Sequence, residues 1–219
     1  MGKKIGFVGL GTMGFPMAVN LTKAGFEVIG YDAFKGAGER ARAAGITMLN
    51  TLKEVAAQAD EAIISMVRDH AQNVEIIFGE GGLLSAKPKG KIIIVMSTLD
   101  PETMNALGKK VEEESDLRLV SAAVSGGASG AIAGTLSIMT SGPEDILKSL
   151  RPYFDAMGTN IFFYGENPGN SQVAKLVNNM ILGINMNAVA EGLNLIHVIF
   201  YFKDRLFGIL HEKAQYHPI

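Results

Sequence analysis

The chain has 219 residues, 47% of them hydrophobic and 19% charged, which is typical of a globular protein with a buried core and excludes a disordered chain. The formal net charge of −2 offers no general attraction for nucleic acid or for an acidic membrane surface. The sequence has no cysteine, which excludes disulfides and cysteine-based zinc sites, and its four histidines lack metal-ligand spacing. We therefore expect neither a metal site nor a nucleic-acid partner. The apolar run after Lys4 is broken by glycines, unlike a signal peptide, so a cytoplasmic location is expected.

Short apolar runs alternate with helical patterns over residues 1–164, which predicts an α/β fold of the Rossmann type, a mostly parallel sheet with helices on both faces. A helix is predicted after the first run and should end at Gly25. Two other helix starts have explicit signals, because Thr51 and Glu54 form a capping box and Asp100 precedes Pro101. The predicted strands are 5–8, 28–31, 63–67, 92–96, 117–120, 136–139 and 161–164.

The character of the sequence changes after residue 164. Residues 165–172 are rich in Gly, Asn and Pro and are predicted to form a loop, whereas residues 173–202 have no proline and few charges, which predicts one long helix. Its length would suit a membrane span, but Lys175, Glu191 and five asparagines are costly in hydrocarbon. We therefore expect no membrane partner and a helix buried between domains or subunits. The predicted domains are a dinucleotide-binding domain, residues 1–164, and a shortened all-α part with the long helix, residues 165–219.

The predicted cofactor-binding turn is Gly9-Leu10-Gly11-Thr12-Met13-Gly14, a G-x-G-x-x-G pattern that directly follows the first strand and opens a helix. Such glycines allow a tight turn, the approach of a pyrophosphate to the backbone and close packing of the helix, whose N-terminus favours phosphates. The pattern alone is weak, since glycines often mark ordinary turns. Asp32 strengthens it, because a carboxylate that ends the second strand can accept hydrogen bonds from the adenosine ribose. We therefore predict NAD as the cofactor.

A more specific pattern is spread over four segments of the chain. They are residues 5–18, which contain the glycine turn; Met96-Ser97-Thr98; residues 124–136, which begin Val124-Ser125-Gly126-Gly127; and residues 169–179, which include Lys175 and end Asn178-Asn179. Together they make residues 3 to about 195 resemble the β-hydroxyacid dehydrogenases, such as the 3-hydroxyisobutyrate dehydrogenases and the tartronate semialdehyde reductases. The resemblance implies that Thr98 touches the nicotinamide end of NAD, and it places Met66 and Val67 beside the cofactor.

The chemistry of the remaining segments agrees with this resemblance. Hydride transfer to a carbonyl group requires a proton donor at the developing alkoxide, and a lysine whose pKa is lowered by partial burial can serve. Lys175 opens the apolar helix, and Asn178 and Asn179 follow on its face, so that Asn179 can orient the ammonium or the substrate oxygen. The hydroxyl and backbone N–H groups of Ser125-Gly126-Gly127 form a natural cradle for a substrate carboxylate. Taken singly, each feature has a second interpretation. Lys175 is then a solvated charge on a helix, and the glycine pair is an ordinary turn.

The chain departs from the family pattern in three places. Ser121-Ala122-Ala123 stands where the family usually has Asp-Ala-Pro, which is expected to loosen the following loop. Arg68 stands where the family commonly has Pro, and it is either a contact for a phosphate or dicarboxylate or a surface charge. The resemblance fades after Leu195, where family members continue into an all-helical domain that closes over the substrate and builds the dimer. Two interpretations stay open. In one, residues that family members have are missing between Leu195 and Lys203, and Lys203 matches a second active-site lysine of the family. In the other, residues 196–219 are unrelated sequence.

The expected function is that of an NAD-dependent oxidoreductase that interconverts a 3-hydroxyacid and its semialdehyde. The expected partners are a small hydroxyacid or semialdehyde substrate and further copies of the chain, packed through the long helix as a homo-oligomer. One alternative is a dinucleotide-binding remnant with little turnover because its C-terminal lid is missing. Another is an imine reductase, although Lys175 and the loop at Ser125 suit hydroxyacids better. Residues 134–139 resemble the tartronate semialdehyde reductases more closely.

Overall fold

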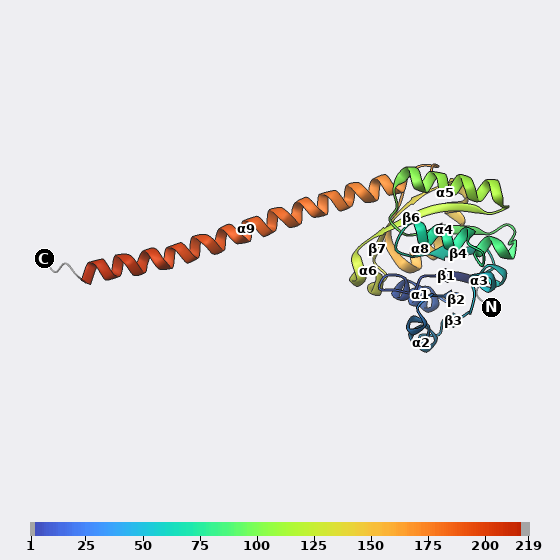
Figure 1. Cartoon of the computed structure of the whole chain (residues 1–219), viewed down its shortest axis with the longest axis horizontal. Coiled ribbons are helices and arrows are strands. Elements are labelled where there is room, and N and C mark those ends of the chain that lie inside the picture. The colour runs from blue at the N-terminus through green and yellow to red at the C-terminus, as the bar shows by residue number, and fades with distance from the viewer. Residues whose placement is uncertain (1–2, 216–219) are drawn as a thin grey trace. The chain divides into compact units, whose positions relative to one another are not determined.

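The structure, a computed structural model, describes residues 3–215, with side chains described for residues 3–34 and 36–201. The chain divides into two compact units, Met1–Leu176 and Val177–Ile219 (Figure 1). The proposed domain boundary between residues 164 and 165 stays a prediction.

The first unit is built on an eight-stranded sheet with the order β3-β2-β1-β4-β5-β6-β7-β8. Within the order β3-β2-β1-β4-β5-β6 every neighbouring pair of strands is parallel, β7 is antiparallel to β6, and β8 is parallel to β7. The strand order reverses between β1 and β4, which is the topological switch point of doubly wound sheets. The predicted fold, a mostly parallel Rossmann-type sheet followed by a long helix, is confirmed. The strands are β1 (Lys4–Val8), β2 (Glu27–Tyr31), β3 (Thr47–Met48), β4 (Ala62–Ser65), β5 (Ile92–Val95), β6 (Arg118–Ser125), β7 (Leu136–Ser141) and β8 (Gly158–Phe163).

Helices cover both faces of this sheet, and two separate hydrophobic clusters lie beneath them (Figure 1). One cluster takes side chains from α1, α2, α6, α7 and α8, and the other from α3, α4, α5 and the short 3₁₀ helix η1. Successive strand residues alternate between the two, as Ile63 and Ile64 do, because neighbouring side chains of a strand point to opposite faces. The helices are α1 (Gly14–Lys23), α2 (Lys35–Ala43), α3 (Leu52–Gln58), α4 (His70–Phe78), η1 (Leu83–Ala86), α5 (Pro101–Glu114), α6 (Gly127–Ala133), α7 (Glu144–Ser149), α8 (Arg151–Met157) and α9 (Asn170–Gln215).

The explicit helix signals of the sequence are confirmed. At the start of α3 the Thr51 hydroxyl accepts the Glu54 N–H and the Glu54 carboxylate accepts the Thr51 N–H, which is a complete capping box. At the start of α5 the Asp100 carboxylate accepts the Thr103 N–H, and this hydrogen bond holds the pKa of Asp100 below its ordinary value. Gly25 follows α1 with a φ of 91°, a conformation that ends a helix easily only at glycine.

Two sequence expectations require correction. Strand β6 runs to Ser125, well beyond the predicted residues 117–120, and Ser121, Ala122 and Ala123 lie buried inside it, paired with β7. Ladder hydrogen bonds hold these residues, and the loosening expected in the loop that follows them stays a prediction. The predicted loop 165–172 is also too long, since α9 begins at Asn170. The polar residues 171 and 172 are fully buried and hydrogen-bonded in its first turn, a pattern that composition alone assigns to a loop.

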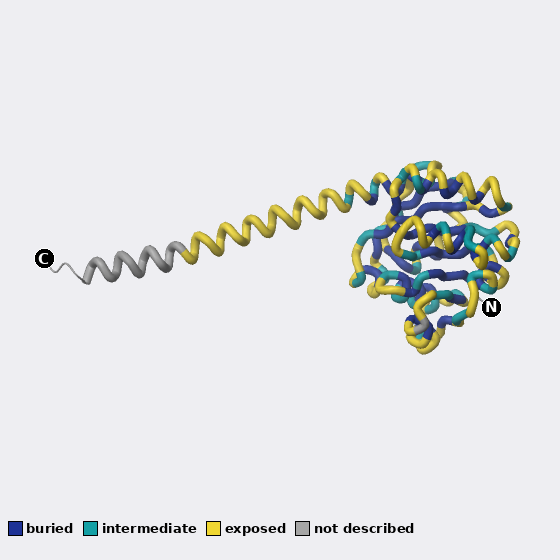
Figure 2. The backbone as a smooth tube through the Cα atoms, in the orientation of Figure 1, coloured by how far each residue is buried: buried dark blue, intermediate teal, exposed yellow. Residues whose placement is uncertain are grey.

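Helix α9 confirms the prediction of one long helix, but in the single chain its apolar residues between 180 and 201 are exposed rather than buried (Figure 2). Among the described residues, no helix is both long and apolar enough to cross a membrane. The exposed fractions lie between 48% and 62% for Met180, Ile181, Ile184, Val189, Leu193, Leu195, Ile196, Val198, Ile199 and Phe200.

Candidate dinucleotide and substrate site

The carboxyl ends of the parallel strands meet at one edge of the sheet, and the predicted site residues of the first unit gather there. Gly9 follows β1, Asp32 follows β2, Met66 follows β4, Thr98 lies shortly after β5, and Ser125 ends β6. In doubly wound sheets this edge, next to the switch point, is where ligands bind. The order of the strands therefore assembles residues that lie more than a hundred positions apart in the sequence.

The glycine turn has the geometry that the sequence pattern predicts. A Cβ atom at Gly9, where φ is 91°, would lie 2.4 Å from the carbonyl oxygen of Met66, and one at Gly14 would lie 1.9 Å from the carbonyl oxygen of Gly9. Both positions therefore exclude any larger residue. At Gly11 no atom lies within 4 Å of the corresponding position, so this side of the turn is open. The turn is packed closely against its neighbours and open on the side where a pyrophosphate would approach.

Asp32 ties the glycine turn to the end of β2. Its Oδ2 accepts the Leu10 N–H at 2.7 Å and its Oδ1 accepts the Phe34 N–H at 2.7 Å. Each carboxylate oxygen retains a further acceptor position for a ribose hydroxyl. The Leu10 side chain is fully buried, so this residue shapes the turn from the core side, whereas Thr12 is exposed and Met13 is half-buried just before α1.

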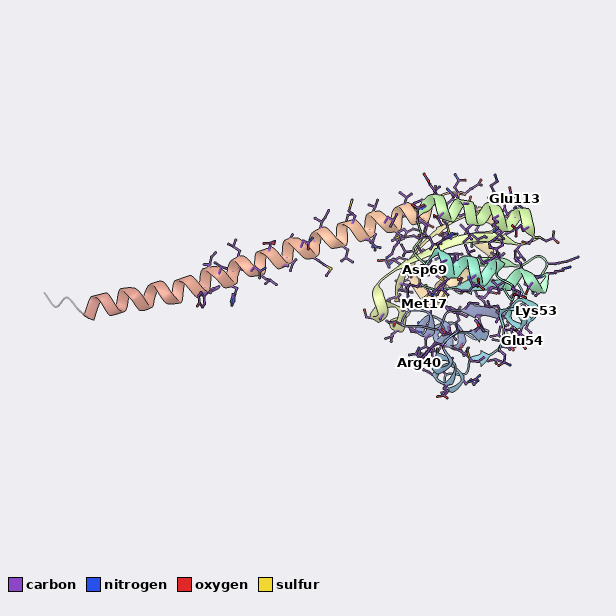
Figure 3. All side chains as sticks on the ribbon, viewed as in Figure 1. Met17, Arg40, Lys53, Glu54, Asp69 and Glu113 are labelled. Atoms are coloured by element: carbon purple, nitrogen blue, oxygen red, sulfur yellow. The ribbon has the colours of Figure 1, made fainter. Side chains whose placement is uncertain are left out.

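A cavity of about 200 Å³ opens beside this carboxylate. Arg40 of α2 (labelled in Figure 3) is a cation that the sequence analysis missed, and it lines this cavity. Its guanidinium donates to the Leu10 carbonyl oxygen at 2.9 Å. The Arg40 guanidinium also lies 4.2 Å from the centre of the Phe15 ring, within the range of a cation–π interaction. Sequence gives no means of choosing Arg40 among the basic residues near Asp32. The cavity is lined by Leu10, Gly11, Asp32, Phe34, Gly36, Ala37 and Arg40.

The turns that follow β4 and β5 are joined by a buried hydroxyl. Ser97 donates to the Val67 carbonyl oxygen at 2.7 Å and accepts a hydrogen bond from the Asn73 side chain at 3.2 Å. Thr98 is exposed beside this link, and Met66 and Val67 are half-buried. The predicted nicotinamide-side residues are therefore held on one connected pair of turns. Arg68 is exposed, and its contact with a ligand stays a prediction.

The proposed carboxylate cradle lies at the end of β6. Ser125 is half-buried, while Gly126 and Gly127 are exposed. Gly126 has a φ of 130° and Gly127 a φ of 62°, conformations that few other residues adopt. A Cβ atom at Gly127 would meet no atom within 4 Å, so the backbone is accessible from that side.

Lys175 lies in α9 and is 9% exposed, so the alternative of a solvated helix charge does not fit its position. Burial removes water from the ammonium and lowers the pKa of Lys175 below its ordinary value. One turn earlier, Gln172 is hydrogen-bonded to the turn after β5, a contact that the sequence analysis did not foresee. Asn179 follows in the second unit and is exposed, and its orienting role stays a prediction.

A parallel sheet with this glycine turn and acidic strand end defines a dinucleotide-binding Rossmann domain. The sequence model of the family described as the NAD binding domain of 6-phosphogluconate dehydrogenase matches residues 4–165. The mitochondrial 3-hydroxyisobutyrate dehydrogenase of Mus musculus is 39% identical over 87% of this chain, and the 2-hydroxy-3-oxopropionate reductase of Escherichia coli (strain K12) is 38% identical over 87%. The chain belongs to the β-hydroxyacid dehydrogenase family and contains its NAD-binding domain.

Solved structures agree with this assignment. The Mycobacterium tuberculosis 3-hydroxyisobutyrate dehydrogenase, whose structure includes L-serine, has a TM-score of 0.79 and 32% identity, and the match covers 88% of this chain and 64% of that chain. An imine reductase from Streptomyces aurantiacus has a TM-score of 0.76 but only 20% identity, which shows a shared fold alone. The chain spans 56% of the length of the mouse relative and 64% of that of the E. coli relative.

Proposed function

We propose that this chain binds NAD(H) and acts as an oxidoreductase that interconverts a small 3-hydroxyacid and its semialdehyde. The observation that carries the proposal is the burial of Lys175 in the helix turn that is hydrogen-bonded to the turn after β5. A lysine in this position, with a pKa lowered by burial, can give a proton to a developing alkoxide and take it back in the reverse direction.

The residues of the first unit fit the proposed cofactor. The open side of Gly11 leaves room for a pyrophosphate, the backbone N–H groups of the glycine turn that leads into α1 would donate to it, and Asp32 can accept from the ribose. The bound nicotinamide would supply or accept the hydride. Thr98, Met66 and Val67 would border that end and shield it from water. We propose NAD rather than NADP, because the Asp32 carboxylate would repel a 2′-phosphate.

The substrate would be held by its carboxylate. Ser125 offers a hydroxyl, and Gly126 and Gly127 offer exposed backbone N–H groups at the end of β6. The carbonyl carbon would then face the hydride donor, with the Lys175 ammonium as acid. By its spacing on the helix, Asn179 would orient that ammonium or the substrate oxygen. An imine substrate has no carboxylate that needs this cradle, so we favour a hydroxyacid.

Single-turnover oxidation of NADH tests the proposal directly. Enzyme and NADH are mixed with semialdehydes that carry a carboxylate, and with matched aldehydes that lack it, and absorbance at the nicotinamide band is followed. Oxidation with the carboxylated compounds alone is the expected result. Tight NADH binding without oxidation of any compound would instead support a dinucleotide-binding protein with little turnover.

We also propose that the chain associates with itself through α9. The exposed apolar side chains between residues 180 and 201 form the kind of surface that marks an association site, and burying them is worth roughly 25 cal/mol per Å². Light scattering should give at least a dimer, and changing both Ile184 and Leu193 to glutamate should give a smaller particle with unchanged NADH affinity. A clean monomer before mutation would contradict this packing.

A cytoplasmic location stays a prediction.

A further inference from the structure

A buried polar network lies beneath the first turn of α9. It consists of hydroxyl groups from β6, from β7 and from α9 and one side-chain amide of α9, which also bonds to backbone groups of the turn after β5. The side chains of the network are fully buried: Ser121, Ser141, Ser171 and Gln172. Buried polar groups of this kind are costly unless they are hydrogen-bonded, and here they bond to one another and to the backbone.

The amide of Gln172 is the centre of this network. Its Oε1 accepts the Leu99 N–H at 2.9 Å, and its Nε2 donates to the Ser97 carbonyl oxygen at 3.0 Å and to the Ser121 hydroxyl at 2.9 Å. Since a backbone N–H can only donate and a carbonyl oxygen can only accept, these partners fix the orientation of the amide. Gln172 therefore bonds to the residues on both sides of Thr98.

Ser171 strengthens the same anchor. Its N–H donates to the Ser141 hydroxyl at 3.1 Å, and its own hydroxyl donates to Ser121 at 2.7 Å. The Ser141 hydroxyl donates in turn to the Pro168 carbonyl oxygen at 2.7 Å. The first turn of α9 is thus attached by side chains to β6, to β7 and to the turn after β5.

Lys175 lies on the helix face that this network holds. It follows Gln172 by three residues and Ser171 by four, and side chains with this spacing are neighbours on a helix surface. All three are buried. The side chains that anchor this turn are uncharged, and burial alone lowers the pKa of Lys175. The depth at which Lys175 lies is consequently set by the groups that hold its helix turn.

We propose that Gln172 is a positioning residue whose amide fixes Lys175 relative to the Ser97–Leu99 turn, so that the proton donor and the nicotinamide-side Thr98 are held as one rigid part. The role of this part in hydride transfer rests on the proposed function, whereas the positioning of Lys175 does not. An amide suits the task because it offers a donor and an acceptor to two backbone groups that flank one residue. Methionine has a similar length but can satisfy neither group.

The test measures Lys175 itself. Lysines are reductively methylated with ¹³C-formaldehyde, the Lys175 signal is identified by its loss in Lys175→Arg, and its titration is followed by NMR in the intact chain. In Gln172→Met we expect the titration midpoint to move up towards that of the exposed lysines, because the loosened turn admits water. The milder variant Ser121→Ala removes one partner of the amide and should give a smaller shift in the same direction. If Gln172→Met does not fold, the Lys175 titration in Ser121→Ala tests the proposal in its place.

Tyr153→Phe provides the matched control. It removes a hydrogen bond from a buried side chain to Glu61, outside the network, and should lower the free energy of unfolding without moving the Lys175 midpoint. An unchanged midpoint in both network variants would overturn the proposal and leave Gln172 a purely structural residue.

If the chain turns over, Gln172→Met should also slow single-turnover hydride transfer roughly tenfold or more while the NADH Kd changes less than threefold. If the wild-type chain oxidises no NADH, the proposed function fails, and the NMR titration still decides whether Gln172 positions Lys175.

Discussion

The two ends of the candidate site lie along the same edge of the sheet but are built in different ways. At the end proposed for the adenosine, Asp32 and Arg40 both bond to backbone groups of Leu10, which lies 22 and 30 positions earlier in the sequence, beside an open cavity. At the Lys175 end, Gln172 bonds to residues 51 to 75 positions earlier, in full burial. The first end is made of local segments whose turns carry their own sequence signals. The second depends on distant strands, and its geometry exists only once the sheet has formed.

This difference predicts that chemistry and binding can be separated, most strongly at Lys175. Lys175→Ala should slow hydride transfer on the order of 10²–10⁴-fold while leaving the NADH Kd nearly unchanged, since a positioned acid contributes about that much. Lys175→Arg should not restore the rate, because a guanidinium does not release its proton near neutral pH. Stopped-flow single turnovers and NADH titrations on the same samples measure both quantities. A parental rate in the alanine variant would mean that Lys175 is not the acid.

The adenosine end should control the choice of cofactor. Two unit charges about 4 Å apart repel by roughly 4 kcal/mol at an effective dielectric of 20, and solvent exposure should reduce the repulsion between Asp32 and a 2′-phosphate to about 2 kcal/mol. We therefore expect NADH to bind some thirtyfold more tightly than NADPH, as measured by calorimetry. Equal dissociation constants would remove the proposed role of Asp32 in this choice.

The glycine turn offers a matched pair of variants within the adenosine end. Gly11→Ala adds a methyl group where no atom lies within 4 Å, so the fold should keep its stability while NADH binding weakens about tenfold through obstruction of the pyrophosphate. Gly14→Ala forces a Cβ atom to 1.9 Å from a carbonyl oxygen and should lower the free energy of unfolding by roughly 1–3 kcal/mol. Urea unfolding and NADH titration distinguish the two. Equal stability losses in both variants would show that the open side of Gly11 is not open in solution.

The same comparison explains how much could be predicted from the sequence. The glycine turn, Asp32, the capping box at Thr51 and the parallel sheet all have short-range signals. The capping box and the mostly parallel sheet are confirmed, and the glycine turn and Asp32 lie at the expected strand ends, while their role in binding stays a prediction. Gln172 and Arg40 were missed because a glutamine in a polar stretch and an arginine on a surface helix have no distinctive local pattern. The same limit misplaced the start of α9, since the partners that hold residues 171 and 172 come from the turn after β5, from β6 and from β7. The resemblance to the family pointed to Lys175, but its burial is a property of the folded chain.

The smallest effect is expected at Arg40, which shares its cavity with Asp32 and partly offsets the carboxylate. Arg40→Gln keeps a side-chain donor for the Leu10 carbonyl oxygen but removes the charge, so NADPH should bind about threefold more weakly while NADH changes little. The effect is small because the guanidinium is exposed and screened by water. Arg42→Gln is the matched control, since it removes the same charge from α2 at a residue that does not line the cavity. If both variants weaken NADPH equally, Arg40 acts only through net charge. If Arg40→Gln weakens NADH and NADPH alike, the main task of Arg40 is to hold the glycine turn through Leu10 and Phe15, and its charge has no part in the choice of cofactor.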